Sequence, residues 1–176
     1  MADLRENVVV DRGIISKIQT YIPGFNGYRV KEDLRAADNM LRMQIAERLA
    51  SIRRDAEGCR SVMAANSSLE HLERLGALIS RFKTVEQEVA HAAQGYSGIS
   101  AKSKVGDVEL NKLYEYDYAL VSSLADMAAD AQKLKAAASS DNKASIRENI
   151  DAMAARIDTF EATFKNRMTS VTDMEA

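Results

Sequence analysis

Four carboxylates are the side chains in this sequence whose types and spacing could do chemistry. They are Asp38, Glu86, Asp117 and Glu161. At about 100° per helical residue, each falls within about 60° of the centre of an apolar stripe on its own segment. In a bundle whose helices alternate in direction, all four belong to the half where the segment carrying Asp38 begins. Inward carboxylates at one end of a bundle could form ion pairs or hold a metal ion.

Positively charged side chains lie on the flanks of the same stripes. Arg42, Lys83 and Lys165 are each near one of the carboxylates. Because unpaired buried charge is costly, we expect ion pairs and hydrogen bonds, either inside the bundle or at its surface. Removing one partner should then lower stability. The members of the predicted polar layer are Arg35, Asp38, Arg42, Glu86, Asp117 and Glu161.

A metal centre is the alternative use of these carboxylates. Ferritin-like bundles combine inward Glu residues with two Glu-x-x-His motifs. This sequence has one such motif, Glu88-Val-Ala-His91, and its His91 points about 120° away from the apolar stripe. His71 has no Glu three positions earlier. The available ligands therefore do not favour a metal site, and we expect neither a metal nor a cofactor.

Nucleophilic and phosphate-binding signatures are also missing from the sequence. Cys59 lies on an apolar stripe with no His at helical reach, which is typical of a small buried packing residue. The segment GYSGIS at 95–100 has glycines but neither Walker spacing nor a preceding strand, so we expect a loop. The sequence predicts no catalytic residue.

The elements that must position the carboxylates are helices. Apolar residues recur every three or four positions, which predicts four long helices at 29–65, 68–94, 108–138 and 142–171 and a short amphipathic helix at 14–22. Residues 1–10 are expected to be frayed. Four helices joined mostly by short turns should pack up-down-up-down, with the short helix laid across one end or side. We therefore expect one all-α four-helix bundle domain over residues 1–176.

Turn and capping residues separate these predicted helices. Pro23 and Gly24 should end the short helix. Ser67 and Glu70 have the spacing of a capping box for the helix that begins at 68. The run from 139 to 142, SSDN, should end one helix and cap the next.

The composition limits the possible functions. The chain has 176 residues, of which 46% are hydrophobic, with one Pro and no Trp, a mixture that favours helix. A net charge of -2 argues against a nucleic-acid-binding protein. A single Cys, with no apolar run long enough to span a membrane, makes a reducing cytoplasmic location the expected one.

Two surfaces could bind a partner. The short helix has an apolar face that could lie in a membrane interface or dock on its own bundle, formed by Ile14, Ile15, Ile18, Tyr21, Ile22 and Phe25. Its polar side is not rich in lysine, so docking on the bundle is the simpler expectation. A second, weaker seam of small and apolar residues includes Met43 and Tyr118 and could allow self-association.

Two segments carry a resemblance to a known set of proteins. PGFNGYRVKEDLRAADNMLR and LNKLYEYDYALV resemble uncharacterised prokaryotic helical proteins that carry PGFxGY, a basic residue followed by ED, and LYExD. The resemblance implies that Arg35, Asp38, Arg42 and Asp117 belong to one constellation. It implies a prokaryotic cytoplasmic origin and no known activity.

The sequence predicts a non-enzymatic helical interaction or scaffold protein, with a protein partner or a second copy as the binding partner. The alternatives are a ligand-binding or metal-binding bundle that uses the inward carboxylates, and a protein that associates with a membrane surface through residues 14–25.

Overall fold

The computed structural model describes the backbone of residues 4–28, 31–92 and 107–173, and the side chains of residues 12–28, 36–92 and 108–171. Within these ranges the chain is all-α. Its elements are α1 (Leu4–Tyr21), α2 (Lys31–Ala65), the 3-10 turn η1 (Leu69–His71), α3 (Leu72–His91), α4 (Asp107–Ser139) and α5 (Lys143–Asp173). The four long helices are therefore confirmed, while the segment GYSGIS lies outside the described residues.

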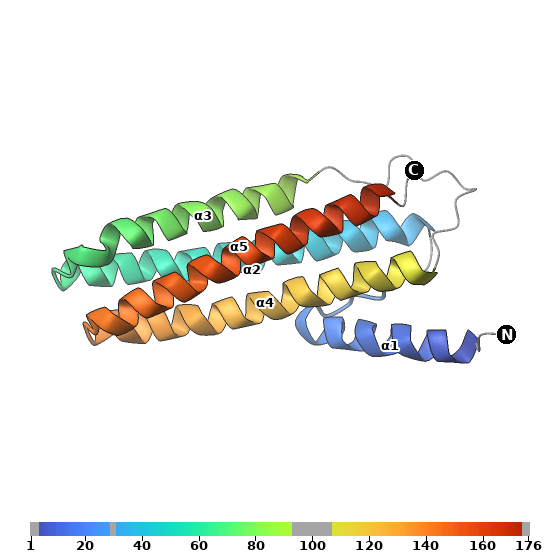
Figure 1. Ribbon diagram of the computed structural model, residues 1–176, viewed down its shortest axis with the longest axis horizontal. Coiled ribbons are helices and arrows are strands. Elements are labelled where there is room, and N and C mark those ends of the chain that lie inside the picture. The colour runs from blue at the N-terminus through green and yellow to red at the C-terminus, as the bar shows by residue number, and fades with distance from the viewer. Residues whose placement is uncertain (1–3, 29–30, 93–106, 174–176) are drawn as a thin grey trace.

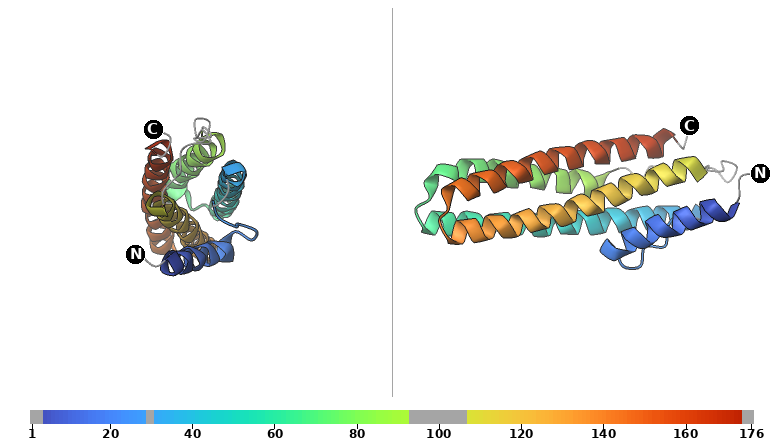
Figure 2. Two further views of the ribbon diagram at one scale, coloured as in Figure 1. Left: turned by 90° about the vertical axis from the view of Figure 1, so that its right-hand side faces the viewer. Right: turned by 60° about the horizontal axis from the view of Figure 1, so that its bottom comes forward.

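The four long helices alternate in direction and form an up-down-up-down bundle (Figure 1). Helix α2 packs against α3 and α4, and α5 packs against the same two helices. Helices α3 and α5 therefore run in the same direction side by side. Seen along its long axis, the bundle has α1 on the outside, where it packs against α4 (Figure 2).

A regular alternation of three-residue and four-residue steps brings the core together. The buried positions that follow this alternation are 38, 42, 45, 49, 52, 56, 59 and 63 in α2; 75, 78, 82, 85 and 89 in α3; 113, 117, 120, 124, 127, 131, 134 and 138 in α4; and 146, 150, 153, 157, 160, 164, 167 and 171 in α5. This spacing averages about 3.5 residues and is typical of helices that pack with coiled-coil geometry. Four of these core positions carry charge, namely Asp38, Arg42, Asp117 and Arg167.

The first helix is longer than the sequence predicted. Helix α1 begins at Leu4, so the expectation that residues 1–10 are frayed is wrong for the part of that segment that the structure describes. Short helices are marginal in water and are held by tertiary packing of an apolar face. Ile15 and Ile18 of α1 are buried in the common core and supply that packing. The helix ends at Tyr21, whose carbonyl oxygen accepts a hydrogen bond from Arg48 of α2.

The two turns at the opposite end of the bundle are tied together. The predicted capping box is wrong, because Ser67 has a φ of 60° and no side chain caps the 3-10 turn that follows. The Ser68 hydroxyl instead donates to the carboxylate of Asp141 in the α4–α5 turn. The predicted cap at 139–142 is present, since the Asn142 side-chain oxygen accepts from the Ser145 amide at 3.1 Å.

Candidate functional site

A buried charged layer crosses the bundle at the end where α2 begins. Its members are Tyr28, Asp38, Arg42, Asp117 and Arg167, none of them more than 3% exposed. Tyr28 precedes α2, and the charged residues take core positions of α2, α4 and α5. Charged side chains are almost never fully buried unless they are paired. We refer to these five residues as the charged layer.

Arg167 of α5 joins the two carboxylates of the layer. Its Nε donates to Asp117 Oδ1 at 2.5 Å, and its Nη2 lies 2.8 Å from Asp38 Oδ1. The contact with Asp38 Oδ1 is an ion pair without a directed hydrogen bond. One guanidinium therefore bridges α2 and α4 from the third helix, α5.

Tyr28 connects the segment before α2 to Asp117 and Arg167. Its hydroxyl donates to Asp117 Oδ2 at 2.5 Å and accepts from Arg167 Nη2 at 3.1 Å. Its ring stacks on Tyr114 of α4 with centroids 5.3 Å apart, and its backbone amide donates to the Tyr114 hydroxyl at 2.8 Å. Both the ring and the backbone of Tyr28 are thereby held against α4.

Arg42 ties the layer to the end of α3. Its Nε donates to Asp38 Oδ2 at 2.8 Å, and its Nη1 donates to the carbonyl oxygens of Val89 at 3.3 Å and Ala92 at 3.1 Å. The last carbonyls of a helix lack intrahelical partners and carry partial negative charge. Arg42 therefore satisfies both a buried carboxylate and the C-terminus of α3.

The layer contains two carboxylates and two guanidinium groups, so its charges balance. Burial raises the pKa of the Asp117 carboxyl above its usual value, although Arg167 and the Tyr28 hydroxyl act in the opposite direction. A group whose pKa is raised by folding stabilises the fold when protonated, and this contribution is lost as pH rises through the raised pKa. When Asp117 is ionised, the positive charge of Arg167 offsets the cost of burying its negative charge.

The structure brings together only part of the predicted polar layer. Asp38, Arg42 and Asp117 meet as expected, but Glu86 pairs with Arg53 at 2.8 Å, away from them and half-buried. Glu161 pairs with Arg81 and with Lys165. The side chain of Arg35 lies outside the described side chains. The inclusion of Glu86 and Glu161 in one layer is wrong, because an angle near the apolar stripe also fits the edges of a helix face.

Two members of the layer were missed from the sequence. Apolar residues in the last helix favour a step from Phe164 to Met168, whereas the core step in the structure is from Phe164 to Arg167. A strict alternation of three and four residues would have placed Arg167 inside. Tyr28 lies in the glycine-containing segment between two helices, and no local signal indicates that its hydroxyl reaches Asp117.

The two layer carboxylates are already occupied by guanidinium groups. Both oxygens of Asp117 accept hydrogen bonds, and both oxygens of Asp38 lie beside Arg42 or Arg167. A metal ion would have to displace two buried cations from them. Within the described ranges, no group of three His, Cys, Asp or Glu side chains is placed to hold a metal ion.

The apolar face of the short helix docks on its own bundle, which is the simpler of the two expectations for it. Ile15, Ile18, Ile22 and Phe25 are buried, so the alternative that they form a membrane or partner surface is wrong for these four residues. Ile14, Tyr21 and Tyr118 are partly buried against the core, with the Tyr21 and Tyr118 rings 6.4 Å apart. Fully burying an apolar side chain contributes about 1.5–3 kcal/mol to stability. The four buried side chains therefore favour docking of this segment on its own bundle over contact with a membrane. Met43 is 50% exposed and remains a surface residue.

The described residues contain no helix both long and apolar enough to cross a bilayer.

Cys59 is expected to react slowly with thiol reagents in the folded protein. It is buried among the α2 core residues, and burial raises the pKa of its thiol above the usual value. A smaller thiolate fraction and poor access both slow nucleophilic attack. The rate of labelling with a disulfide reagent should rise at least about tenfold in denaturant. Equal rates in native and denatured protein would contradict this burial.

Replacing Glu161 with Gln should remove a carboxylate that stabilises the fold at neutral pH. The Lys165 hydrogen bond lowers the pKa of Glu161, burial opposes it, and the Arg81 charge lowers it further. A lowered pKa contributes stability above the usual value of 4.5 that is lost as pH falls through the lowered pKa. We expect Glu161→Gln to cost about 1 kcal/mol at pH 7 and less below pH ~4, measured by denaturant unfolding across this pH range. A cost that grows on acidification would contradict the pairing.

The fold and the layer together define an all-α four-helix bundle whose core carries a closed set of charged residues at one end. No protein-family model, curated protein or solved structure matches the chain.

Proposed function

We propose that this protein is a non-enzymatic helical interaction protein of the cytoplasm, which presents a surface of its bundle to a protein partner. The charged layer carries this proposal. Its five members bind one another and the end of α3, so their chemistry is directed at the helices of the same chain. A layer of this kind positions α2, α4 and α5 relative to one another and to the segment before α2.

The two segments behind the resemblance to prokaryotic helical proteins support the same view. PGFNGYRVKEDLRAADNMLR supplies Tyr28, Asp38 and Arg42, and LNKLYEYDYALV supplies Tyr114 and Asp117. These side chains contact one another directly or through Arg167. Polar residues that meet inside the fold make the arrangement of the helices more rigid, and this role requires no reaction at that site.

Affinity capture of the tagged, intact chain from its source cells tests the proposal. The expected result is one protein, or a few, recovered at near-stoichiometric amounts, which the purified chain then binds directly. Another four-helix bundle with the same tag is the control for non-specific binding. Recovery of a lipid, a nucleotide or a metal in place of a protein would contradict the proposal.

A further inference from the structure

Helix α1 is attached to the bundle differently from the other helices. It packs mainly against α4, whereas each of the four long helices packs against at least two others. It lies on the outside of the bundle, side by side with α4 and pointing in the same direction (Figure 1, Figure 2). An element that is held on one side only can leave without separating the helices beneath it.

The surface that α1 covers is a short stripe on α4, formed by Tyr114, Tyr118 and Val121, which we call the α4 stripe. Tyr114 and Val121 are no more than 1% exposed, whereas Ala128, seven residues further along, is exposed. Seven residues make about two turns, so these positions lie on the same side of the helix. The difference arises because α1 ends at Tyr21, whose ring lies 6.4 Å from that of Tyr118.

Apolar packing and a few polar contacts hold α1 on the α4 stripe. The buried isoleucines of this segment follow steps of three and four residues, and they are Ile15, Ile18 and Ile22. Lys17 Nζ lies 5.7 Å from the centroid of the Tyr118 ring. Arg48 of α2 donates a hydrogen bond to the carbonyl oxygen of Tyr21.

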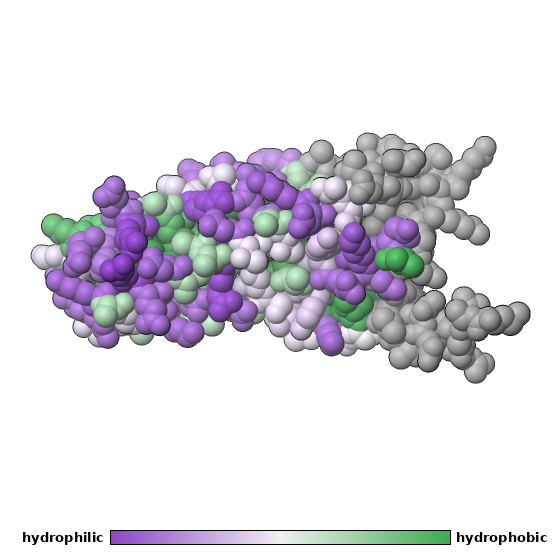
Figure 3. Space-filling model, viewed as in Figure 1, coloured by the Kyte–Doolittle hydropathy of each residue, from purple (hydrophilic) through white to green (hydrophobic). Residues whose placement is uncertain are grey.

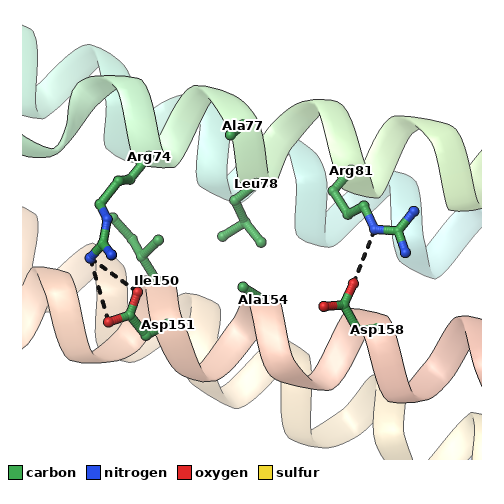
Figure 4. A pocket seen from close by; sticks show the side chains of 8 residues that line it. All are labelled: Arg74, Ala77, Leu78, Arg81, Ile150, Asp151, Ala154 and Asp158. Carbon is green, nitrogen blue, oxygen red and sulfur yellow. Dashed lines mark hydrogen bonds and ion pairs between the residues drawn. The ribbon is translucent and has the colours of Figure 1, made fainter.

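Ion pairs cross the seams between the long helices, and none of the ion pairs among the described side chains joins α1 to the bundle. Figure 4 shows Arg74–Asp151 and Arg81–Asp158 between α3 and α5. Other ion pairs join α2 to α3 and α4 to α5. The charged layer connects α2, α4 and α5 as well. These contacts keep the long helices together when α1 leaves.

The joint between α1 and the bundle lies at Pro23 and Gly24, which are both exposed. Gly24 has a φ of +88°, and a Cβ built on it would meet no atom within 4 Å. Two hydrogen bonds close the joint: the Phe25 amide donates to the Ile22 carbonyl at 3.3 Å, and Gln19 Nε2 donates to the Phe25 carbonyl at 2.8 Å. Because glycine adopts positive and negative φ about equally well, rotation at Gly24 can open this joint with little strain.

The residues after the joint belong to the bundle. The Phe25 ring lies 5.3 Å from the ring of Tyr28 and 6.4 Å from that of Tyr114, edge-on to both. Tyr28 is in turn hydrogen-bonded to Asp117 and Arg167 in the charged layer. The boundary between the part that can move and the part that stays therefore falls at Pro23 and Gly24.

We propose that α1 is a hinged strap, which opens as a unit at Pro23 and Gly24 and uncovers the α4 stripe while the four long helices and the charged layer stay closed. On the face that Figure 3 shows, hydrophilic residues surround scattered apolar ones, so the closed molecule presents little continuous apolar surface there. Opening of the strap exposes the apolar and aromatic side chains that α1 covers. The strap goes beyond the proposed function and does not depend on it.

Thiol labelling of a Val121→Cys variant of the intact chain compares the α4 stripe with the bundle core in one molecule. The introduced thiol lies beneath α1, and Cys59 in the core is the reference. Peptide mass spectrometry gives the labelling rate at each site in native buffer relative to its rate in denaturant. On that scale position 121 should react at least about tenfold faster than Cys59, because local opening costs less than global unfolding. Equal protection of the two sites would overturn the strap.

Ile18→Asp should hold the strap open, because it places a charge in the apolar contact between α1 and α4. Added to Val121→Cys, it should raise the labelling rate at position 121 at least about tenfold and leave Cys59 protected. Ser16→Asp adds the same charge at an exposed position of α1 and should leave both rates unchanged. If Ile18→Asp accelerates labelling at Cys59 as much as at position 121, α1 and the bundle unfold together and the strap is wrong.

Native-state hydrogen exchange tests the strap in the chain without substitutions. Opening of α1 exposes little surface, so exchange of its amides should depend weakly on low urea concentrations. Exchange of buried amides in α4 requires global unfolding and should depend steeply on urea. The same rate and the same urea dependence in α1 and α4 would show one cooperative unit and overturn the proposal.

Discussion

Arg167→Met is expected to lower the free energy of unfolding by about 3–5 kcal/mol, because it leaves two buried carboxylates with too little positive charge. Asp117 loses its only guanidinium partner among the described contacts, and Asp38 keeps Arg42 alone. Tyr28 loses a hydrogen bond from the same guanidinium. The loss is a large part of the roughly 5–15 kcal/mol that stabilises a typical domain. Equilibrium unfolding in urea, followed by circular dichroism, measures it.

A triple replacement distinguishes lost pairing from lost packing. Tyr28→Phe/Asp117→Leu/Arg167→Met removes the polar groups around Asp117 together and leaves the Asp38–Arg42 pair in place. Replacing a whole buried polar set by apolar residues is often neutral or stabilising. We expect the triple variant to recover at least about half of the stability lost in Arg167→Met. If the triple variant is less stable than the single one, volume and not charge determines the effect.

Gly27→Ala is expected to cost about 2–5 kcal/mol, since the position combines a left-handed backbone with a close contact. Gly27 has a φ of +85°, where a side chain is strained. A Cβ there would lie 2.6 Å from the Tyr114 hydroxyl oxygen and 2.9 Å from Ile15 Cδ1. Tyr114 would have to move, and with it the hydroxyl that accepts from the Tyr28 amide. Urea unfolding gives the magnitude.

Gly24→Ala is the matched control for this substitution. Gly24 has a φ of +88° but no atom within 4 Å of a Cβ built on it. Its replacement should therefore cost only the backbone strain, about 1–2 kcal/mol. The difference between the two variants isolates the contact with Tyr114 and Ile15. Equal costs would show that the contact is relieved by small shifts of these side chains.

Local patterns were sufficient to predict the helices. The recurrence of apolar residues every three or four positions predicted all four long helices, and the cap at Asn142 lies where the SSDN run indicated. These features depend on neighbours within a few residues, so the linear sequence contains them. The start of α1 at Leu4 was not predictable in this way, because packing of Ile15 and Ile18 on the bundle supports a helix that would be marginal alone.

The charged layer was predictable only in part. Asp38 and Asp117 could be grouped because each lies near the centre of an apolar stripe at the same end of the bundle, with Arg42 on the flank beside Asp38. Glu86 and Glu161 share that property, yet they pair with Arg53 and Arg81 at other positions. The angle around a helix axis is a local quantity, whereas the partner of a carboxylate depends on the rotation and height of the facing helix.

The positions of Arg167 and Tyr28 in the charged layer depend on contacts between segments that are distant in the sequence. Side-chain polarity favours Met168 for the core and the alternation of three and four residues favours Arg167, so the choice is made when α5 takes its register against α4. Tyr28 lies 89 residues from Asp117 along the chain, and the fold brings its hydroxyl to 2.5 Å from that carboxylate. Hydrophobic periodicity is a property of each segment alone. Charge pairing between distant segments exists only after the helices have packed, because a buried ion pair requires both partners at one place.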